Sequence, residues 1–393
     1  MTLPPLNPVY AGLGTTIFTT MSAMAAETGA LNLGQGFPET DGFPEVREAA
    51  AKALIDRSNQ YAPMKGQAAL LEAVAEFYGR TQGLSLDPAR NVLITSGATE
   101  ALAAAVFSLI SPGDEVIVFE PHYDAYAPLI ERAGGVVVRV RLSPPDWRFT
   151  EAQLTEAFSR RTRMVMVTTP NNPTTRLIPT EDWALLARFC IEHQAYVVSD
   201  EVWEQVVFDG ATHKGVLNVP GLETLGVKIG SAGKLFALTG WKVGFVCAHE
   251  RLVSQMAKAH QFLTFSTPPM LQSAVAFGLG LPKSRFVEEV AALQRSRERW
   301  RAGLEAEGFR TLPSEGTYFL NIDLPGSGIA LEGESFARRA LKEAGVAVIP
   351  LDAFCAPGGD SLPVVRLCFA KSDATLDRGI ERLTVARRLC GIV

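Results

Sequence analysis

Lys234 stands among small residues in the stretch Ser231–Trp241, directly after an apolar run at residues 227–230 that is typical of a buried strand. A lysine in such a place is unfavourable unless its charge is used or removed. Covalent chemistry is one use, because a partly desolvated lysine amine is a better nucleophile than a free one and forms a Schiff base with a carbonyl group. A surface lysine in a glycine-rich turn is the structural alternative.

Two turns together predict a phosphate site. Ser231 and Lys242 flank Lys234 with a hydroxyl and a second cation, which are donors that a phosphate prefers. Elsewhere, a strand ends at Thr95 and a helix begins at about Ala98, after a glycine, and backbone amides at a helix start bind anions. A glycine before a helix is common, so this second turn gains weight only if Ser231 and Lys242 reach the same anion.

Three more side chains follow predicted strands. Asp200 comes directly after an apolar strand, where a carboxylate is poorly solvated unless it faces a cation or a strong donor such as a protonated pyridine nitrogen. Tyr123 is placed to stack on a flat ring, and Asn172 to donate to a ring oxygen. The structural alternatives are a helix cap for Asp200, a core ring for Tyr123 and a tight turn for Asn172.

Arg366 lies inside the otherwise apolar run at residues 364–369. A buried guanidinium needs a carboxylate that it can bind with two hydrogen bonds. An internal Asp or Glu and the α-carboxylate of a substrate both satisfy this requirement, and both remain open here.

These residues are carried by a predicted α/β fold. Short β-branched runs alternate with longer amphipathic segments from about residue 68 to 280, which favours a mostly parallel sheet covered by helices on both faces. Ligands of such sheets bind beyond the carboxyl ends of the strands, where the residues above fall. The predicted strands are residues 92–95, 115–119, 136–140, 164–168, 196–199, 227–230 and 242–247.

The chain is predicted to have three parts. Residues 1–45 form an N-terminal arm, residues 46–281 a large domain, and residues 282–393 a smaller α+β domain against which the arm packs. A charged helix at residues 283–308 opens the smaller domain, and its predicted strands lie near residues 317–322, 346–350 and 364–369.

Composition narrows the class of protein. With 47% hydrophobic and 20% charged residues, the 393-residue sequence is typical of globular domains, and its net charge of −5 gives no reason to expect nucleic acid or an anionic membrane as partner. No signal peptide and no apolar run of about 18 residues is found. Five scattered cysteines without a CxxC pair suggest reduced thiols, so we expect a cytoplasmic protein with no metal site.

The sequence resembles the class I/II pyridoxal-phosphate-dependent aminotransferases of fold type I over nearly its whole length. It is most similar to the subgroup of kynurenine/glutamine and bacterial methionine aminotransferases. The motifs that carry this resemblance are Asn32–Pro38, Asn59–Tyr61, Ser231–Gly244, His260–Gln261, Glu315–Phe319 and Arg366–Lys371. The resemblance implies a homodimer whose two active sites lie at the subunit interface.

The resemblance also implies roles for individual residues. Lys234 would form the Schiff base with pyridoxal 5'-phosphate and carry the proton, and Asp200 would pair with the pyridine nitrogen. The remaining expected contacts are Ala98, Thr99, Ser231, Lys242 and Tyr61 of the partner for the phosphate, Tyr123 and Asn172 for the ring, Gly36, Asn172 and Arg366 for the substrate carboxylate, and Phe265 of the partner for the substrate side chain.

One residue departs from the family pattern. Trp203 stands where the family usually has a tyrosine that contacts the same cofactor oxygen as Asn172, and an indole N–H donates but cannot accept. We therefore expect a perturbed pKa for the Schiff base of Lys234.

The expected reaction is a ping-pong transamination between an L-amino acid of the methionine, glutamine, aromatic or kynurenine type and a 2-oxo acid. The alternatives are cysteine-conjugate β-lyase activity and succinyldiaminopimelate transamination. A P-loop protein is disfavoured because leucine follows Lys234, and a transcription regulator would need an added DNA-binding domain.

Overall fold

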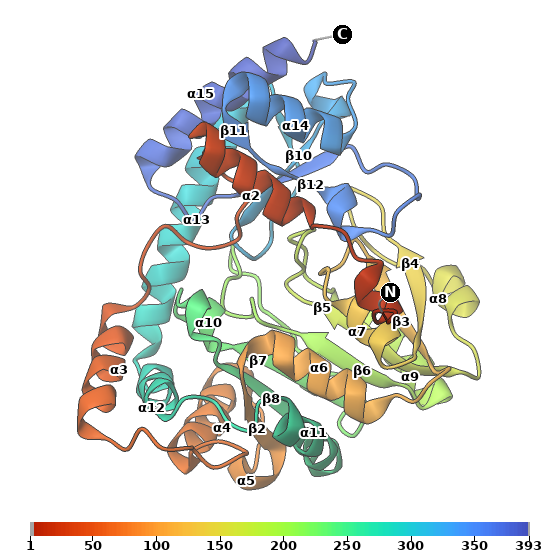
Figure 1. The fold of residues 1–393 in the computed structure, drawn as a ribbon, viewed down its shortest axis with the longest axis vertical. Coiled ribbons are helices and arrows are strands. Elements are labelled where there is room, and N and C mark those ends of the chain that lie inside the picture. The colour runs from red at the N-terminus through yellow and green to blue at the C-terminus, as the bar shows by residue number, and fades with distance from the viewer. Residues whose placement is uncertain (1–3, 392–393) are drawn as a thin grey trace.

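The computed structural model describes residues 4–391 and contains a seven-stranded sheet (Figure 1). Neighbouring strands pair in parallel from β7 to β4, whereas β8 runs antiparallel to both of its neighbours. This arrangement confirms the predicted mostly parallel sheet. In spatial order the strands are β2 (Val92–Thr95), β8 (Gly244–Ala248), β7 (Gly226–Ser231), β6 (Tyr196–Asp200), β5 (Thr162–Thr168), β3 (Glu115–Glu120) and β4 (Val136–Arg141).

Helices cover both faces of this sheet because alternate strand residues point to opposite sides. In β3, Val116 and Val118 pack with the helices α6, α7 and α11, whereas Ile117 packs with α8 and α9. A third cluster joins α3, α4 and α12 to the β2 end of the sheet. The helices are α3 (Pro44–Asp56), α4 (Ala68–Gln82), α6 (Gly97–Leu109), α7 (Tyr126–Arg132), α8 (Glu151–Ala157), α9 (Thr180–His193), α11 (Glu250–Leu263) and α12 (Pro269–Leu279).

A second, antiparallel sheet lies in the C-terminal part of the chain. Its order is β12 (Ile349–Pro350), β13 (Val364–Cys368), β10 (Phe319–Asp323) and β9 (Arg310–Thr311). The helices α13 (Lys283–Ala306), α14 (Gly333–Ala344) and α15 (Asp373–Leu389) pack around it. Figure 1 shows α13 running from the second sheet to the neighbourhood of α12.

The N-terminal segment joins this second part. Strand β1 (Leu31–Asn32) pairs in parallel with β11 (Val346–Ala347), and α2 (Ile17–Thr28) packs beside α14 (Figure 1). The predicted strand at residues 346–350 is wrong as a single element, because β11 and β12 belong to different sheets. The predicted boundaries at residues 45 and 281 stay a prediction.

The strand ends of the large sheet meet at one edge. Asp200 is the register partner of Thr168, and Ser231 that of Gly244, which also pairs with Thr95. Because β8 is reversed, its first residue lies at the edge where the neighbouring strands end. In the described residues, no helix is both long and apolar enough to cross a membrane.

Candidate active site

A cavity of about 360 Å³ lies at this edge of the sheet, between the strand ends, the N-terminal segment and the second sheet. Of the predicted site residues, only Tyr61 and Phe265 are missing from its lining. The structure therefore brings together Gly36, Ala98, Thr99, Tyr123, Asn172, Asp200, Trp203, Ser231, Lys234, Lys242 and Arg366.

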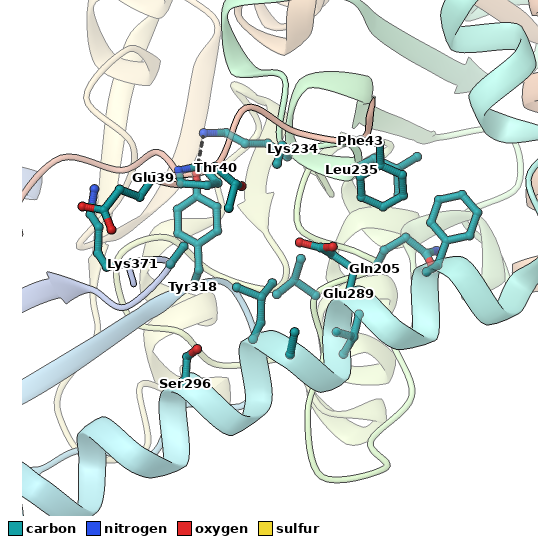
Figure 2. A pocket seen from close by; sticks show the side chains of 18 of the residues that line it. Glu39, Thr40, Phe43, Gln205, Lys234, Leu235, Glu289, Ser296, Tyr318 and Lys371 are labelled. Carbon is teal, nitrogen blue, oxygen red and sulfur yellow. Dashed lines mark hydrogen bonds between the residues drawn. The ribbon is translucent and has the colours of Figure 1, made fainter. Parts of the chain in front are cut away.

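A larger cavity of about 460 Å³ adjoins the first one (Figure 2). Its walls are mainly apolar side chains, several of them from α13, and it contains neither Asp200 nor Arg366. Lys234 lines both cavities, and Figure 2 shows the Tyr318 ring standing below the lysine amine. The acid, the amine and the guanidinium meet only in the smaller cavity, so we place the chemistry there.

One end of the smaller cavity is rich in hydrogen-bond donors. Helix α6 begins there at Gly97, with no side chain capping its first turn, so its amides remain available. A Cβ atom at Gly97 would lie 3.4 Å from Lys242 Nζ, and Ser231 ends β7 beside it. Among the described residues Lys242 has no acidic partner within salt-bridge distance. These groups fit a phosphate.

Asp200 closes another side of the cavity. It is 6% exposed and accepts hydrogen bonds from the Tyr126 hydroxyl at 3.1 Å and from the Val202 amide at 3.4 Å. Burial raises the pKa of Asp200 to about 6. No cation forms an ion pair with it within residues 4–391, so its carboxylate can receive a strong N–H donor from a ligand.

Lys234 lies on the short helix α10 (Ala232–Leu235). Its Nζ atom is 3.3 Å from the Tyr318 hydroxyl and 3.4 Å from the Gly36 carbonyl oxygen. It also lies 4.8 Å from the centre of the Trp203 ring. Burial lowers the pKa of Lys234 to about 8, so at pH 7 about a tenth of the amine is unprotonated and nucleophilic, far more than at the ordinary lysine pKa.

Arg366 is a buried guanidinium that forms no ion pair with any acidic residue the structure describes. It is 3% exposed, lies 3.9 Å from the centre of the Phe319 ring, and donates to Asn172 Oδ1 at 2.5 Å and to the Gly34 carbonyl at 3.2 Å. Burial lowers its pKa to about 10, and its Nε atom has no partner among the described residues. Of the two alternatives, an internal carboxylate is not bonded to Arg366 anywhere in residues 4–391.

Three other predicted residues occupy the walls. Asn172 uses Oδ1 for Arg366, which leaves its amide N–H groups for a ligand. The Tyr123 ring stands edge-on to Tyr126, with ring centroids 5.9 Å apart. Trp203 is buried and meets the Tyr318 ring edge-to-face at 4.3 Å, so the larger indole is accommodated by aromatic packing.

Tyr61 and Phe265 lie outside the cavity. Tyr61 is 86% exposed and Phe265 is 41% exposed, and their rings pack edge-to-face with centroids 5.6 Å apart. The sequence assigned both to the site of a partner subunit, and that assignment stays a prediction.

Sequence reasoning missed two tyrosines that touch the central residues. Tyr126 donates to Asp200, and Tyr318 contacts Lys234. Both are buried, and burial raises the pKa of each well above its usual range. Tyr318 lies within the motif Glu315–Phe319, and Tyr126 follows the predicted site residue Tyr123 by three positions, but neither position indicated which group the hydroxyl would contact.

A second group of buried charges lies next to the cavity but outside it. The Lys228 ammonium contacts the carboxylates of Glu201 and Glu204, and His213 Nε2 lies 2.8 Å from Glu201. Burial alone would raise the pKa of Glu201, but Lys228 and His213 outweigh it and hold that pKa at about 2. The run at residues 227–230, described above as apolar, therefore contains a fully buried charge.

Comparison with known proteins identifies the family of the chain. A family profile described as aminotransferase class I and II matches residues 28–383. The methionine aminotransferase of Escherichia coli is 40% identical over 387 residues, which cover 98% of this chain and 99% of that protein. Kynurenine–oxoglutarate transaminase 1 of Homo sapiens is 33% identical over 397 residues, covering 92% and 93%.

Solved structures show the same architecture. The N-succinyldiaminopimelate aminotransferase from Mycobacterium tuberculosis superposes with a TM-score of 0.94 and 38% identity, covering 97% of this chain and 100% of that one. The family match covers residues 28–383, which include the whole large sheet and all residues lining the smaller cavity except Thr16 and Phe18. The chain therefore belongs to the class I and II aminotransferases of fold type I, and it is an enzyme that transfers amino groups.

Proposed function

We propose that the smaller cavity binds pyridoxal 5'-phosphate and that the enzyme moves an amino group from an L-amino acid to a 2-oxo acid by a ping-pong mechanism. One observation carries this proposal: Lys234, whose pKa is lowered to about 8, and the buried carboxylate of Asp200, which forms no ion pair within residues 4–391, share one cavity. The family is known for this cofactor, and the unpaired donors around Lys242 fit its phosphate.

The residues present suit each part of that cofactor. The amides of Ala98 and Thr99, with Ser231 and Lys242, would hold the phosphate. Asp200 would keep a proton on the pyridine nitrogen, since a buried carboxylate without a cation is stabilised by such a donor. When bound, the cofactor supplies an electron sink for the charge that develops at the amino acid Cα.

The other ring contacts and the proton carrier come from this chain as well. Tyr123 would stack against the ring, Asn172 would donate to its oxygen, and the Trp203 indole would lie near the same oxygen. Lys234 is the base that would take the proton from the Cα atom and return it, because its lowered pKa makes both steps accessible near neutral pH.

The substrate would be oriented by Arg366. Its guanidinium would bind the α-carboxylate, with Asn172 and the backbone at Gly36 beside it. The aromatic rings of Phe18 and Phe354 line the same cavity, which favours amino acids with apolar or aromatic side chains. We therefore propose a donor of the methionine, glutamine, aromatic or kynurenine type, with succinyldiaminopimelate as the second candidate because two relatives differ on this point.

We propose in addition that the enzyme works as a homodimer. Tyr61 and Phe265 form an exposed aromatic pair, and Phe262 nearby on α11 is 85% exposed. A second copy would cover these rings and receive Tyr61 at its phosphate and Phe265 at its substrate side chain. Sedimentation analysis is expected to give twice the 42.4 kDa chain mass.

The test of the function is Lys234→Ala. We expect the variant to lose transamination by at least about 10³-fold and to lose the visible absorbance of the Schiff base, while it still binds the cofactor measurably. Lys342→Ala, which removes an exposed lysine on α14, is the matched control and is expected to behave as wild type. Transamination by Lys234→Ala near the wild-type rate would refute the proposal.

A panel of donors and acceptors identifies the substrate. Methionine, glutamine, phenylalanine, kynurenine and succinyldiaminopimelate are compared as donors with several 2-oxo acids. Release of pyruvate from a cysteine conjugate without any acceptor would reveal β-lyase activity on the same site.

A further inference from the structure

The partners of the Lys234 amine differ in what they can do. Within the described residues, Nζ is within hydrogen-bond distance of two groups, the Gly36 carbonyl oxygen and the Tyr318 hydroxyl. A carbonyl oxygen only accepts, so it favours the ammonium form. The Trp203 ring face also attracts a cation and has little attraction for a neutral amine.

The Tyr318 hydroxyl can serve both forms of the amine. In the structure it donates to the Gly36 carbonyl oxygen at 2.6 Å, so its lone pairs are available to accept from the ammonium. When the amine has lost its proton, rotation about the C–O bond turns the same O–H toward the nitrogen lone pair. Neither Gly36 nor Trp203 replaces this function, because the carbonyl has no proton and the indole presents its face.

The position of this hydroxyl is fixed. The Tyr318 ring is buried, meets Trp203 edge-to-face at 4.3 Å and lies 5.0 Å from Phe319. The ring lines the larger cavity, to which Lys234 also contributes (Figure 2). The hydroxyl consequently stays beside Lys234 while the lysine side chain can move.

We propose that Tyr318 is the positioning residue for Lys234, holding the free amine in the cavity through a hydroxyl that accepts from it when protonated and donates to it when neutral. The inference rests on Lys234 being the amine of the proposed reaction. It also links that amine to the segment around Gly36, since both hydrogen-bond to one oxygen atom of Tyr318.

The experiment uses Tyr318→Phe, which removes the hydroxyl and keeps the ring and its packing. In the full-length protein without cofactor, acetic anhydride labels lysines competitively over a pH series, and mass spectrometry quantifies Lys234. A hydrogen bond to a charged group is stronger than one to a neutral group, so we expect the labelling midpoint of Lys234 to fall by about one pH unit. In the loaded enzyme we expect kcat to fall about tenfold, with KM for the amino donor changed less than about threefold.

Two further variants make the result specific. Tyr196 begins β6, at the end of that strand opposite to Asp200, and lies outside both cavities. Tyr196→Phe also removes a hydroxyl, and it is expected to match wild type in both the labelling midpoint and kcat. Tyr318→Leu removes the ring as well. An unchanged labelling midpoint or an unchanged kcat in Tyr318→Phe overturns the proposal, including the case in which only Tyr318→Leu loses activity.

The labelling needs neither cofactor nor substrate, so the proposed contact between Tyr318 and Lys234 can be refuted independently of the proposed function. A shifted midpoint in a protein that transaminates no donor supports the contact and refutes the function. A wild-type enzyme that transaminates, with labelling indifferent to Tyr318→Phe, supports the function and overturns this inference.

Discussion

Asp200 and Glu201 are neighbours in sequence, both are buried carboxylates, and their environments are opposite. Glu201 is surrounded by Lys228, His213 and the Val216 amide, which donates to it at 2.8 Å. Asp200 has one hydroxyl and one distant amide. Although both side chains are buried, the pKa of Glu201 is about 2 and that of Asp200 is about 6.

The difference indicates that Glu201 belongs to a structural ion cluster, whereas Asp200 belongs to a ligand-binding site. Around Glu201 the protein supplies the compensating charge itself, so breaking that cluster costs folding free energy. Within residues 4–391, no cation forms an ion pair with Asp200, so the ionised form of this carboxylate is unfavourable and would be stabilised by a cationic donor from a ligand. The following changes test this contrast, beginning with the largest effect.

Lys228→Met should break the closed cluster. It leaves the buried carboxylates of Glu201 and Glu204 without their cation, and we expect about 3–5 kcal/mol of lost stability at pH 7. The pKa of Glu201 lies below its ordinary value of 4.5, so its contribution is present above that value and disappears as pH falls toward about 2. Urea unfolding at pH 7 measures the loss. Lys342→Met is the exposed control. A loss of stability below about 1 kcal/mol in Lys228→Met would contradict the claim that the ion cluster around Glu201 stabilises the fold.

Asp200→Asn should stabilise the folded protein at pH 7, whereas Lys228→Met should destabilise it. The pKa of Asp200 is raised above its ordinary value of 3.8, so the stability linked to its proton is present below that value and lost as pH rises through about 6. At pH 7 the cofactor-free protein should therefore gain about 1–3 kcal/mol on this substitution, and little at pH 4. Transamination should fall at least about 10²-fold because the ring nitrogen loses its carboxylate.

The matched control for this change is Glu201→Gln, one residue away. It should destabilise the protein at pH 7 while Asp200→Asn stabilises it, and melting temperatures at both pH values give the comparison. Equal signs for the two substitutions would remove the distinction between the closed cluster and the open cavity.

Arg366→Lys tests whether the guanidinium in the smaller cavity binds the substrate carboxylate. Lysine keeps the charge but loses the planar fork that binds a carboxylate with two hydrogen bonds, so we expect KM for the amino donor to rise about tenfold. Stability should change by less than about 1 kcal/mol, because no carboxylate among residues 4–391 depends on Arg366 as its ion-pair partner. Arg387→Lys on α15, whose partners are backbone carbonyls, controls for the exchange itself. An unchanged KM would show that the guanidinium does not bind substrate.

The large sheet was predictable because its strands are continuous apolar runs, and parallel strands buried on both faces require such runs. The residues that follow these runs were predictable for the same reason. Asp200, Ser231 and Asn172 stand out as polar groups at positions where the fold places a ligand. No comparable rule applies to two-residue strands, and the separation of β11 from β12 depends on which distant segment each one meets.

The sequence was least informative where polar groups satisfy one another. Lys228 was overlooked inside an apolar run, since nothing local shows that Glu201 and Glu204 will surround it. Tyr318 and Tyr126 resemble core aromatic residues, and only the folded chain shows where their hydroxyls point. Contacts between residues far apart in sequence are fixed by packing and leave no periodic signal.

The reversed direction of β8 limits evolutionary change in the loop that carries the lysine. Both ends of the segment from Ser231 to Gly244 are anchored in adjacent strands and face each other in register. An inserted or deleted residue anywhere between them would have to be absorbed within one short loop, and the reach of Lys234 would change with it. Substitutions in this loop can accumulate one at a time, but its length is expected to be invariant among enzymes that retain activity.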